Sequence, residues 1–465
     1  MEELIKEMLD RAKAAQRVVE RYSQEQIDDI CLSVAWEVYR EENIEMLARA
    51  AVSETGMGVV ADKITKHKNK VLGVVADIKG AKSVGLIEAD EKKQIFKYAK
   101  PVGVVGALVP VTNPTATPAS NAISILKGAN AVIFAPHPKA KACTKMAIDF
   151  MRAGLKRIGA PEDLVQVICE PSIELTRELM KAVDLVVATG GGAMVKAAYS
   201  SGTPAYGVGP GNSVQMIAED ADIKDAIKKI KSSKCFDNAT SCSSENSIIV
   251  QKDRYDAVLG ELKSAGAYVC TAEEKARLQN WMWRPNKEGV VGINPLIIAK
   301  SAATIASEAG LNVPEGISML VVEGDMPVES DPFAREKLSP VLTVWKYGEF
   351  LEGYSIMERL TDHCGTGHSC GIHSFNEAYI GYIGEHMRTS RVIVRQPQAA
   401  ANGGAFFNHM PSTVTLGCGT WGGNITSENI TYRHFLNITW LSKPVDIWTP
   451  SEEEMFGGLF ERYGR

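Results

Sequence analysis

The sequence has little that suits nucleic acid or a lipid bilayer. Its 51 Lys and Arg residues are outnumbered by 56 Asp and Glu residues, so a net charge of -5 leaves no basic excess for a phosphate backbone or an anionic membrane. No apolar run approaches bilayer length, and the N-terminus lacks the basic, apolar and small-residue order of a signal peptide. We therefore expect no nucleic-acid partner, no membrane partner and a cytoplasmic location.

Disulfide and metal patterns are also missing. The nine cysteines are odd in number and spread from Cys31 to Cys418, which predicts reduced thiols rather than a disulfide framework. The segment Asp362–His373 holds three histidines and two cysteines, but not the paired spacings of a structural zinc site. We therefore expect no metal ion, and a glycine-broken loop leading into a strand.

An alternation of strands and helices is the main pattern that is present. Residues 2–40 are helical in pattern without helix breakers, and a helical region continues to about residue 80. From Pro101 short apolar strands alternate with amphipathic helices, which predicts α/β architecture with parallel sheets covered by helices on both faces. A charged stretch at 88–100 alternates like a strand and predicts a projecting arm, to which Tyr432–Trp448 would pair.

Two turns are candidates for binding a nucleotide. Thr189, Gly190 and Gly191 follow an apolar strand and precede a helix, where a phosphate could meet free N–H groups. The usual G-x-G-x-x-G fingerprint is absent, so a plain tight turn is the alternative. In the second turn, Lys139 could face a ribose hydroxyl or a 2′-phosphate, or be a solvated surface lysine.

Cys242 is the candidate nucleophile. It lies among small polar residues in Asn238–Ser247, just before an apolar strand, whereas a structural cysteine usually lies among aliphatic side chains. A nucleophile needs open space and nearby N–H groups, and we expect these groups to lower the pKa of the thiol.

These features belong to a set of seven ordered motifs. The motifs are Val111–Thr115, Ala135–Lys139, Ala188–Gly191, Ala198–Gly202, Cys242–Glu245, Glu336–Pro340 and Gly417–Asn424. In this order the chain resembles, essentially end to end, the CoA-acylating branch of the aldehyde dehydrogenase superfamily. The resemblance implies a variant Rossmann cofactor domain, an α/β catalytic domain and a β-arm that joins subunits into a homodimer or homotetramer. It assigns residues 1–87 and 102–236 to the dinucleotide-binding domain, 237–427 to the catalytic domain, 88–101 and 428–449 to the arm, and 450–465 to a C-terminal tail.

The resemblance also implies a mechanism and its residues. The Cys242 thiolate attacks the aldehyde, hydride passes to NAD or NADP, and a thioester remains on the enzyme for coenzyme A. Asn113 and the Cys242 N–H would stabilise the oxyanion, and Glu336 would hold the nicotinamide ribose. Without the resemblance, Asn113 is part of a turn and Glu336 is a charge before a strand. The expected cofactor contacts are Thr112, Pro136, His137, Lys139, Thr189, Gly190, Gly191 and Glu336.

The sequence lacks one catalytic side chain that the hydrolytic relatives carry. Those enzymes carry a glutamate that activates water, but the corresponding stretch Gly207–Asn212 has no carboxylate. A missing general base costs roughly 10²–10⁴-fold in rate, whereas a thiol is intrinsically more nucleophilic than water, so the sequence favours CoA as the acceptor. His368 matches a histidine of the acylating branch and would assist the thiol or CoA; an ordinary loop histidine is the alternative.

The expected substrate is a small anionic aldehyde or its acyl-CoA. Tyr206–Asn212 resembles both sulfoacetaldehyde and succinate-semialdehyde acylating enzymes, while Asn238–Ser247 and Cys418–Trp421 are more similar to the sulfoacetaldehyde group. We therefore expect interconversion of sulfoacetaldehyde with sulfoacetyl-CoA. Acylation of succinate semialdehyde, a hydrolytic aldehyde dehydrogenase and a non-catalytic binding protein are the alternatives. Candidates for binding the anionic tail are Arg395, Thr240, Ser241 and Asn408, with a surface arginine as the alternative for Arg395.

Overall fold

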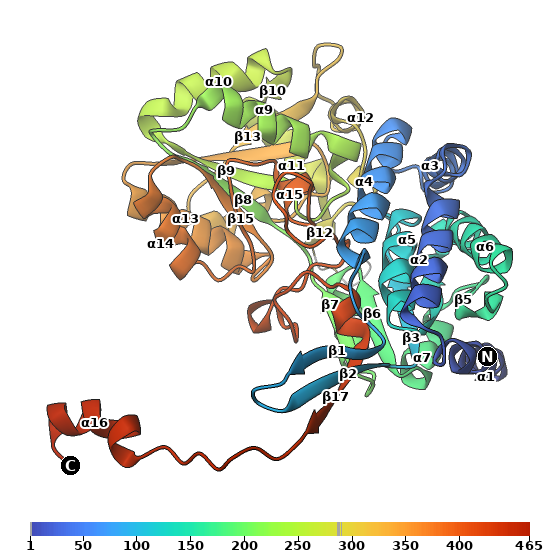
Figure 1. Cartoon of the computed structure of the whole chain (residues 1–465). Helices are drawn as coiled ribbons and strands as arrows, with labels where there is room; N and C mark the ends of the chain where they lie inside the picture. The colour runs from blue at the N-terminus through green and yellow to red at the C-terminus, as the bar shows by residue number, and fades with distance from the viewer. Residues whose placement is uncertain (1, 286–288, 290) are drawn as a thin grey trace.

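The computed structural model describes residues 2–285, 289 and 291–465, which form two parallel sheets, an antiparallel arm and a C-terminal tail (Figure 1). The first sheet has five strands in the order β5-β4-β3-β6-β7. Their bounds are β3 Val104–Val109, β4 Ala131–Pro136, β5 Val165–Val167, β6 Leu185–Thr189 and β7 Ala205–Val208. From β3 the chain builds one half of the sheet through β4 and β5 and the other half through β6 and β7. This reversal opens a crevice at the carboxyl ends of β3 and β6, where open α/β sheets bind ligands.

Helices cover both faces of the first sheet. α2 packs against α5 and α6, α4 packs against α5, and α1 packs against α7 and β4. The bounds are α1 Glu2–Val19, α2 Gln24–Tyr39, α3 Glu41–Thr55, α4 Val60–Ile78, α5 Ala116–Lys127, α6 Lys141–Arg157, α7 Ile173–Ala182 and α8 Gly192–Tyr199. The helical run predicted for residues 2–40 is interrupted before Gln24, because Ser23 and Gln26 form a reciprocal capping box that begins α2.

The second sheet has seven parallel strands in the order β10-β13-β14-β9-β8-β15-β16. Their bounds are β8 Ser213–Ile217, β9 Glu245–Gln251, β10 Ala267–Val269, β13 Met319–Glu323, β14 Val341–Tyr347, β15 Cys370–His373 and β16 Val392–Val394. β8 thus lies in this sheet although it precedes residue 237, the expected start of the catalytic domain, and that boundary stays a prediction. A short antiparallel pair, β11 Trp283–Pro285 and β12 Val291–Ile293, lies outside the sheet.

Alternate residues of β9 face opposite layers of helices. Ile248 and Val250 belong to a core with α9 and α10, whereas Ile249 belongs to a core with α13 and α14. The helix bounds are α9 Ile223–Lys234, α10 Tyr255–Ser264, α11 Ala272–Met282, α12 Ala302–Glu308, α13 Phe350–His363, α14 Glu377–His386 and α15 Gln398–Ala401. The expected α/β architecture with two parallel sheets is confirmed.

The arm is a three-stranded antiparallel sheet in the order β1-β2-β17. β1 Gly85–Asp90 and β2 Ile95–Pro101 form a hairpin, and β17 Leu436–Ser442 pairs with β2 from Leu436 opposite Pro101 to Ser442 opposite Ile95. The predicted pairing is therefore confirmed, but the strand ends at Ser442 instead of continuing to Trp448.

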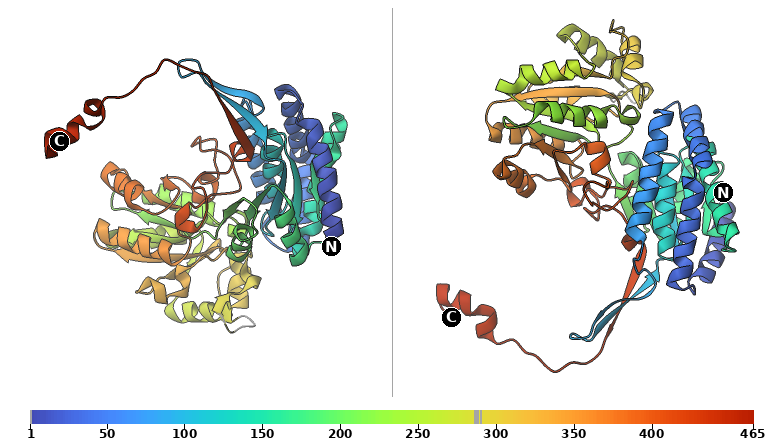
Figure 2. Two further views of the ribbon diagram at one scale, coloured as in Figure 1. Left: turned by 90° about the horizontal axis from the view of Figure 1, so that it is seen from below. Right: turned by 45° about the horizontal axis from the view of Figure 1, so that its top comes forward.

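The C-terminal tail leaves the body after the arm. It runs without regular structure to α16 Glu452–Tyr463, which begins with a capping box between Ser451 and Glu454 and buries none of its residues in this chain. Figure 2 shows the tail extending away from the body in both views. None of the helices that the structure describes is both long and apolar enough to cross a membrane.

Candidate active site

A cavity of about 720 Å³ lies where the two sheets meet. The first sheet contributes residues that follow the carboxyl ends of its strands, such as Asn113 after β3 and Gly190 after β6. The second sheet contributes residues that precede its strands, such as Cys242 before β9 and Glu336 before β14. Motifs that are far apart in the sequence therefore line one cavity, because opposite ends of the two sheets face it.

Cys242 lies against a buried histidine. The distance from Cys242 Sγ to His368 Nε2 is 3.2 Å, and His368 Nδ1 lies 2.9 Å from Ser369 Oγ. Burial lowers the pKa of His368 to about 3, so its imidazole is neutral near pH 7. With Nδ1–H donating to Ser369, Nε2 is free to accept the proton of the thiol.

The expectation of a lowered thiol pKa at Cys242 is wrong. Burial raises the pKa of Cys242 to about 12, and the carboxyl of Glu336 adds to the rise. The small polar neighbours that suggested an open setting are themselves buried, as Thr240, Ser243 and Ser244 show. The resting Cys242 side chain is therefore a protonated thiol, which would need a base in order to act as a nucleophile.

A buried arginine that the sequence did not single out supports the histidine. Arg391 Nη1 donates to the His368 carbonyl at 2.8 Å, and its Nε donates to Asn429 Oδ1 at 2.9 Å. Its positive charge also acts on Cys242, where it opposes the rise in the thiol pKa. A single arginine before a short strand carries no sequence signal that marks this role.

The segment Gly207–Asn212, which has no carboxylate, passes directly beside Cys242. A Cβ added at Gly211 would lie 1.9 Å from the Cys242 carbonyl oxygen, so only glycine fits there. The Gly211 N–H donates to Glu336 Oε1 at 3.2 Å. Burial raises the pKa of Glu336 to about 8, which leaves this carboxyl mostly protonated at neutral pH and unsuited to activate water. We refer to Cys242, His368 and Glu336 as the thiol cluster.

One face of α4 supplies cations to the same region. Lys63, Lys66 and Lys70, here called the lysine cluster, have buried or nearly buried side chains, and Lys66 and Lys70 line the cavity. Lys63 and Lys66 both pair with the buried carboxylate of Asp237, at 3.2 Å and 2.6 Å. This cluster was not predicted from the sequence, although spacings of three and four residues on a helix place the lysines on one face.

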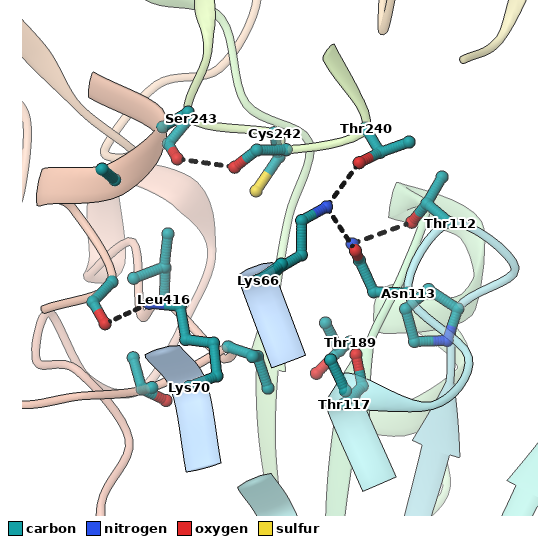
Figure 3. A pocket seen from close by; sticks show the side chains of 18 of the residues that line it. Lys66, Lys70, Thr112, Asn113, Thr117, Thr189, Thr240, Cys242, Ser243 and Leu416 are labelled. Atoms are coloured by element: carbon teal, nitrogen blue, oxygen red, sulfur yellow. Dashed lines mark hydrogen bonds between the residues drawn. The ribbon is translucent and has the colours of Figure 1, made fainter. Parts of the chain in front are cut away.

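Asn113 is held by that cluster. Lys66 Nζ donates to Asn113 Oδ1 at 2.8 Å, and the Asn113 amide makes only a long contact of 3.4 Å to Thr112 Oγ1 (Figure 3). Lys66 also donates to Thr240 Oγ1 at 2.6 Å. Thr240 and Asn113 are thus brought together with Cys242 in one cavity.

The expected cofactor residues lie partly in the cavity. Its lining includes Thr112, His137, Thr189, Gly190, Gly191 and Glu336. Pro136 ends β4 and Lys139 is exposed, and neither belongs to the lining. The N–H of Lys139 donates to His137 Nδ1 at 3.1 Å, so this turn is closed on itself.

The four candidates for binding the anionic tail separate into two pairs. Thr240 and Ser241 line the cavity, whereas Arg395 and Asn408 do not. The Arg395 guanidinium donates to the Ser374 carbonyl and lies 4.4 Å from the centre of the Phe375 ring. Asn408 Oδ1 accepts the N–H groups of Ala405 and Met410, both at 3.1 Å, and so holds a loop together. The side chains of Arg395 and Asn408 therefore bond to nearby backbone groups and do not face the cavity.

The histidines and cysteines of Asp362–His373 do not come together as a set of metal ligands. Among residues 2–285, 289 and 291–465, no group of three or more His, Cys, Asp or Glu side chains is arranged to hold a metal ion. His368 instead contacts Cys242.

Comparisons with known proteins place the chain in a family. A model of the aldehyde dehydrogenase family matches residues 1–408. A sulfoacetaldehyde dehydrogenase of an Acholeplasma species is 65% identical, with 98% of this chain and 94% of that protein covered. An acylating sulfoacetaldehyde dehydrogenase of Bilophila wadsworthia is 56% identical, with 99% of both covered. An acetylating succinate-semialdehyde dehydrogenase of Clostridium kluyveri is 42% identical, with 97% of this chain and 99% of that protein covered.

Solved structures agree with this placement. An acetylating aldehyde dehydrogenase of Geobacillus thermoglucosidasius has a TM-score of 0.92 and 37% identity, with 97% of this chain and 98% of that chain covered. A propionaldehyde dehydrogenase of Rhodopseudomonas palustris, solved with bound CoA and an acylated cysteine, has a TM-score of 0.85 and 26% identity, with 94% and 97% covered. The chain therefore belongs to the aldehyde dehydrogenase family, and the resemblance based on the seven motifs is confirmed.

Proposed function

We propose that the protein is a CoA-acylating aldehyde dehydrogenase that interconverts sulfoacetaldehyde, CoA and NAD(P)+ with sulfoacetyl-CoA and NAD(P)H. The observation that carries the proposal is the Cys242–His368 pair, which lies beside a Gly207–Asn212 segment without a carboxylate. The names of the relatives that are 65% and 56% identical support the same substrate.

The chain's own groups would supply the nucleophile, the base and the oxyanion donors, and a bound nicotinamide would accept the hydride. His368 Nε2 accepts the Cys242 proton as the sulfur attacks the aldehyde carbon, and Asn113 with the Cys242 N–H stabilises the resulting oxyanion. Loss of hydride from this thiohemiacetal leaves a thioester on Cys242. In the second half-reaction the CoA sulfur attacks that thioester, and the Cys242 sulfur leaves and takes up a proton.

The cavity fits a nicotinamide cofactor, which supplies the hydride acceptor when bound. Gly190 and Gly191 line the cavity just before α8, where free N–H groups favour a pyrophosphate. A Cβ at Gly191 would meet no atom within 4 Å, so the backbone there is open to a ligand. Glu336, on the opposite side of the cavity, would hold the nicotinamide ribose.

Lys70 is the group that best suits the anionic end of the substrate. Its Nζ donates to the carbonyls of Gly403 and Gly404, at 2.6 Å and 3.4 Å, and among the described residues no carboxylate contacts it. Burial lowers the pKa of Lys70 to about 8, so it is still mostly charged at neutral pH. A sulfonate would supply the missing counter-charge, and the carboxylate of succinate semialdehyde could do the same.

A single-turnover experiment tests whether CoA is the acceptor of the acyl group. Mixed with sulfoacetaldehyde and NAD(P)+ but no CoA, the enzyme should give a burst of NAD(P)H and then stall, because the thioester on Cys242 has no base to activate water. Adding CoA should restart turnover and release sulfoacetyl-CoA. Steady production of free acid without CoA would overturn the acylating assignment.

The substrate assignment has a separate test. If succinyl-CoA were reduced far better than sulfoacetyl-CoA, the acylating chemistry would stand and the substrate would be corrected to succinate semialdehyde. No reduced nicotinamide with any aldehyde, with or without CoA, would leave only a binding function.

We also propose that the arm and the tail join copies of this chain into a homodimer or homotetramer. Ile447 and Trp448 in the tail are 96% and 74% exposed, and the apolar side chains of α16 are also exposed, so the tail has much apolar surface without cover in this chain. Removal of residues 443–465 should shift the mass measured by light scattering towards the monomer. An unchanged mass would show that the tail is not required for assembly. The nine free thiols suit a reducing compartment, and we place the enzyme in the cytoplasm.

A further inference from the structure

We infer that Lys66 is a positioning residue that fixes which end of the Asn113 amide faces the reacting carbonyl. The inference rests on the proposed oxyanion role of Asn113 and adds the group that makes this role possible. The carrying observation is the 2.8 Å contact between Lys66 Nζ and Asn113 Oδ1.

The ammonium group of Lys66 fixes the orientation of the Asn113 side-chain amide. Lysine has three N–H donors and no acceptor, so only the oxygen end of Asn113 can face it. The amide nitrogen must then point away from Lys66, and its one hydrogen-bond contact among the described residues, to Thr112 Oγ1, is long at 3.4 Å. Its N–H groups are therefore available to an oxyanion. In the reversed orientation Asn113 would present an oxygen to the oxyanion and repel it.

Lys66 itself is fixed by the groups around it. Its three donors are taken by Asn113 Oδ1, by Asp237 Oδ2 at 2.6 Å and by Thr240 Oγ1 at 2.6 Å. With no donor left for a substrate, Lys66 differs from Lys70, whose contacts are to backbone carbonyls. The cluster thus contains one cation for positioning and one for the substrate's charge.

Asp237 is the buried anchor of this arrangement. Its side chain also accepts the N–H of Val59 at 2.8 Å, which ties it to the start of α4. Desolvation pushes the pKa of Asp237 upward, but Lys66 and Lys63 outweigh it and hold the pKa below its ordinary value. Asp237 has a positive φ of 51°, a conformation that a non-glycine residue adopts only when its surroundings hold it there.

Lys66 can be substituted without leaving a buried charge unpaired. If Lys66 becomes Met, Asp237 keeps Lys63 as its partner at 3.2 Å, so no carboxylate is left buried alone. The variant Lys66→Met should therefore fold, and its loss of function can be interpreted. Lys66→Gln is a second variant, because glutamine can accept as well as donate and no longer dictates the orientation of Asn113.

The first experiment compares two substrates, sulfoacetaldehyde and the uncharged propionaldehyde. A positioning role predicts that Lys66→Met lowers kcat by roughly tenfold or more for both, as loss of an oxyanion donor would, with KM changed much less. Lys66→Gln should lie between this variant and the wild type. Lys68→Met is the matched control, because Lys68 is on the same helix and pairs at the surface with Glu41. A loss confined to sulfoacetaldehyde, and seen mainly in KM, would overturn the inference and make Lys66 a substrate-binding cation.

The second experiment is a double-mutant cycle with Asn113→Ala. If Lys66 acts through Asn113, Lys66→Met should cost no more than about threefold in kcat once Asn113 is gone, because coupled residues are not additive. An equal loss in both backgrounds would show that Lys66 acts independently and would overturn the inference. If Asn113→Ala alone leaves kcat unchanged, the oxyanion assignment fails together with this inference. CoA-dependent turnover would then still support the proposed acylating function.

Discussion

The thiol cluster and the lysine cluster line one cavity, but they handle charge in opposite ways. Around Cys242 and His368, burial raises the pKa of the acid and lowers that of the base, so the resting pair is neutral. On α4 the Asp237 carboxylate pairs with Lys63 and Lys66, and backbone carbonyls accept the N–H groups of Lys70. The site therefore keeps fixed positive charge for binding and orientation, and creates charge on sulfur only when the reaction begins.

The largest expected effect comes from removing the sulfur. Cys242→Ala should lower dehydrogenase activity by roughly 10⁴-fold or more, because the variant loses the sulfur on which the thioester would form. Binding of NAD(P)H, followed by its fluorescence, should be retained because the cofactor contacts lie elsewhere. The same substitution at Cys364 should leave the chemistry largely in place. Activity within about tenfold of wild type, equivalent to ~1.4 kcal/mol of barrier, would assign the reaction to a different cysteine.

The next largest effect is expected from Gly211→Ala, which tests how closely the backbone packs against Cys242. Gly211→Ala places a Cβ 1.9 Å from the Cys242 carbonyl oxygen, so the backbone that carries the sulfur must shift. A displacement of about 1 Å in a catalytic group costs roughly 10²-fold in rate, which is the expected loss in kcat. Gly209→Ala in the same loop is the control, because a Cβ there meets no atom within 4 Å. Equal activity of the two variants would mean that the loop can relax.

The lysine cluster is tested by the selectivity for anionic aldehydes. Lys70→Met should lower kcat/KM for sulfoacetaldehyde by roughly 10–100-fold, the value of a hydrogen bond to a charged group, and leave propionaldehyde nearly unchanged. Lys68→Met should change neither substrate. A parallel loss for both aldehydes would mean that Lys70 supports the loop at Gly403 and does not bind the substrate's charge.

The sequence predicted the fold well and singled out Cys242 as a candidate nucleophile, because both inferences depend on local patterns. Apolar runs such as β3 and β4 are continuous because the strands are buried on both faces, and Cys242 precedes such a strand. The break before Gln24 was missed because no proline or glycine marks it, although the Ser23–Gln26 capping box that begins α2 could have indicated it.

The roles of Lys66 and Arg391 were not predictable in the same way. Each depends on a partner that is distant in the sequence: Asp237 is 171 residues from Lys66, and His368 is 23 residues from Arg391. The expected lowering of the Cys242 pKa failed for a related reason. Small polar neighbours indicate an open site in the sequence, but whether they are solvated depends on the second sheet and the loop at Gly211.

The smallest effect, and the most direct test of the contrast between the clusters, is the pH dependence of Cys242 alkylation. Because burial raises the pKa of this thiol to about 12, the thiolate is scarce at pH 7 and its fraction grows as the pH rises. Iodoacetamide should therefore inactivate the cofactor-free enzyme about tenfold faster for each pH unit, without a plateau below pH 9. Mass spectrometry can follow Cys242 beside the exposed Cys169 in the same sample. A plateau near pH 7 would show that His368 already holds the thiol proton in the resting enzyme, so that the thiol cluster, like the lysine cluster, would carry its charges before the substrate arrives.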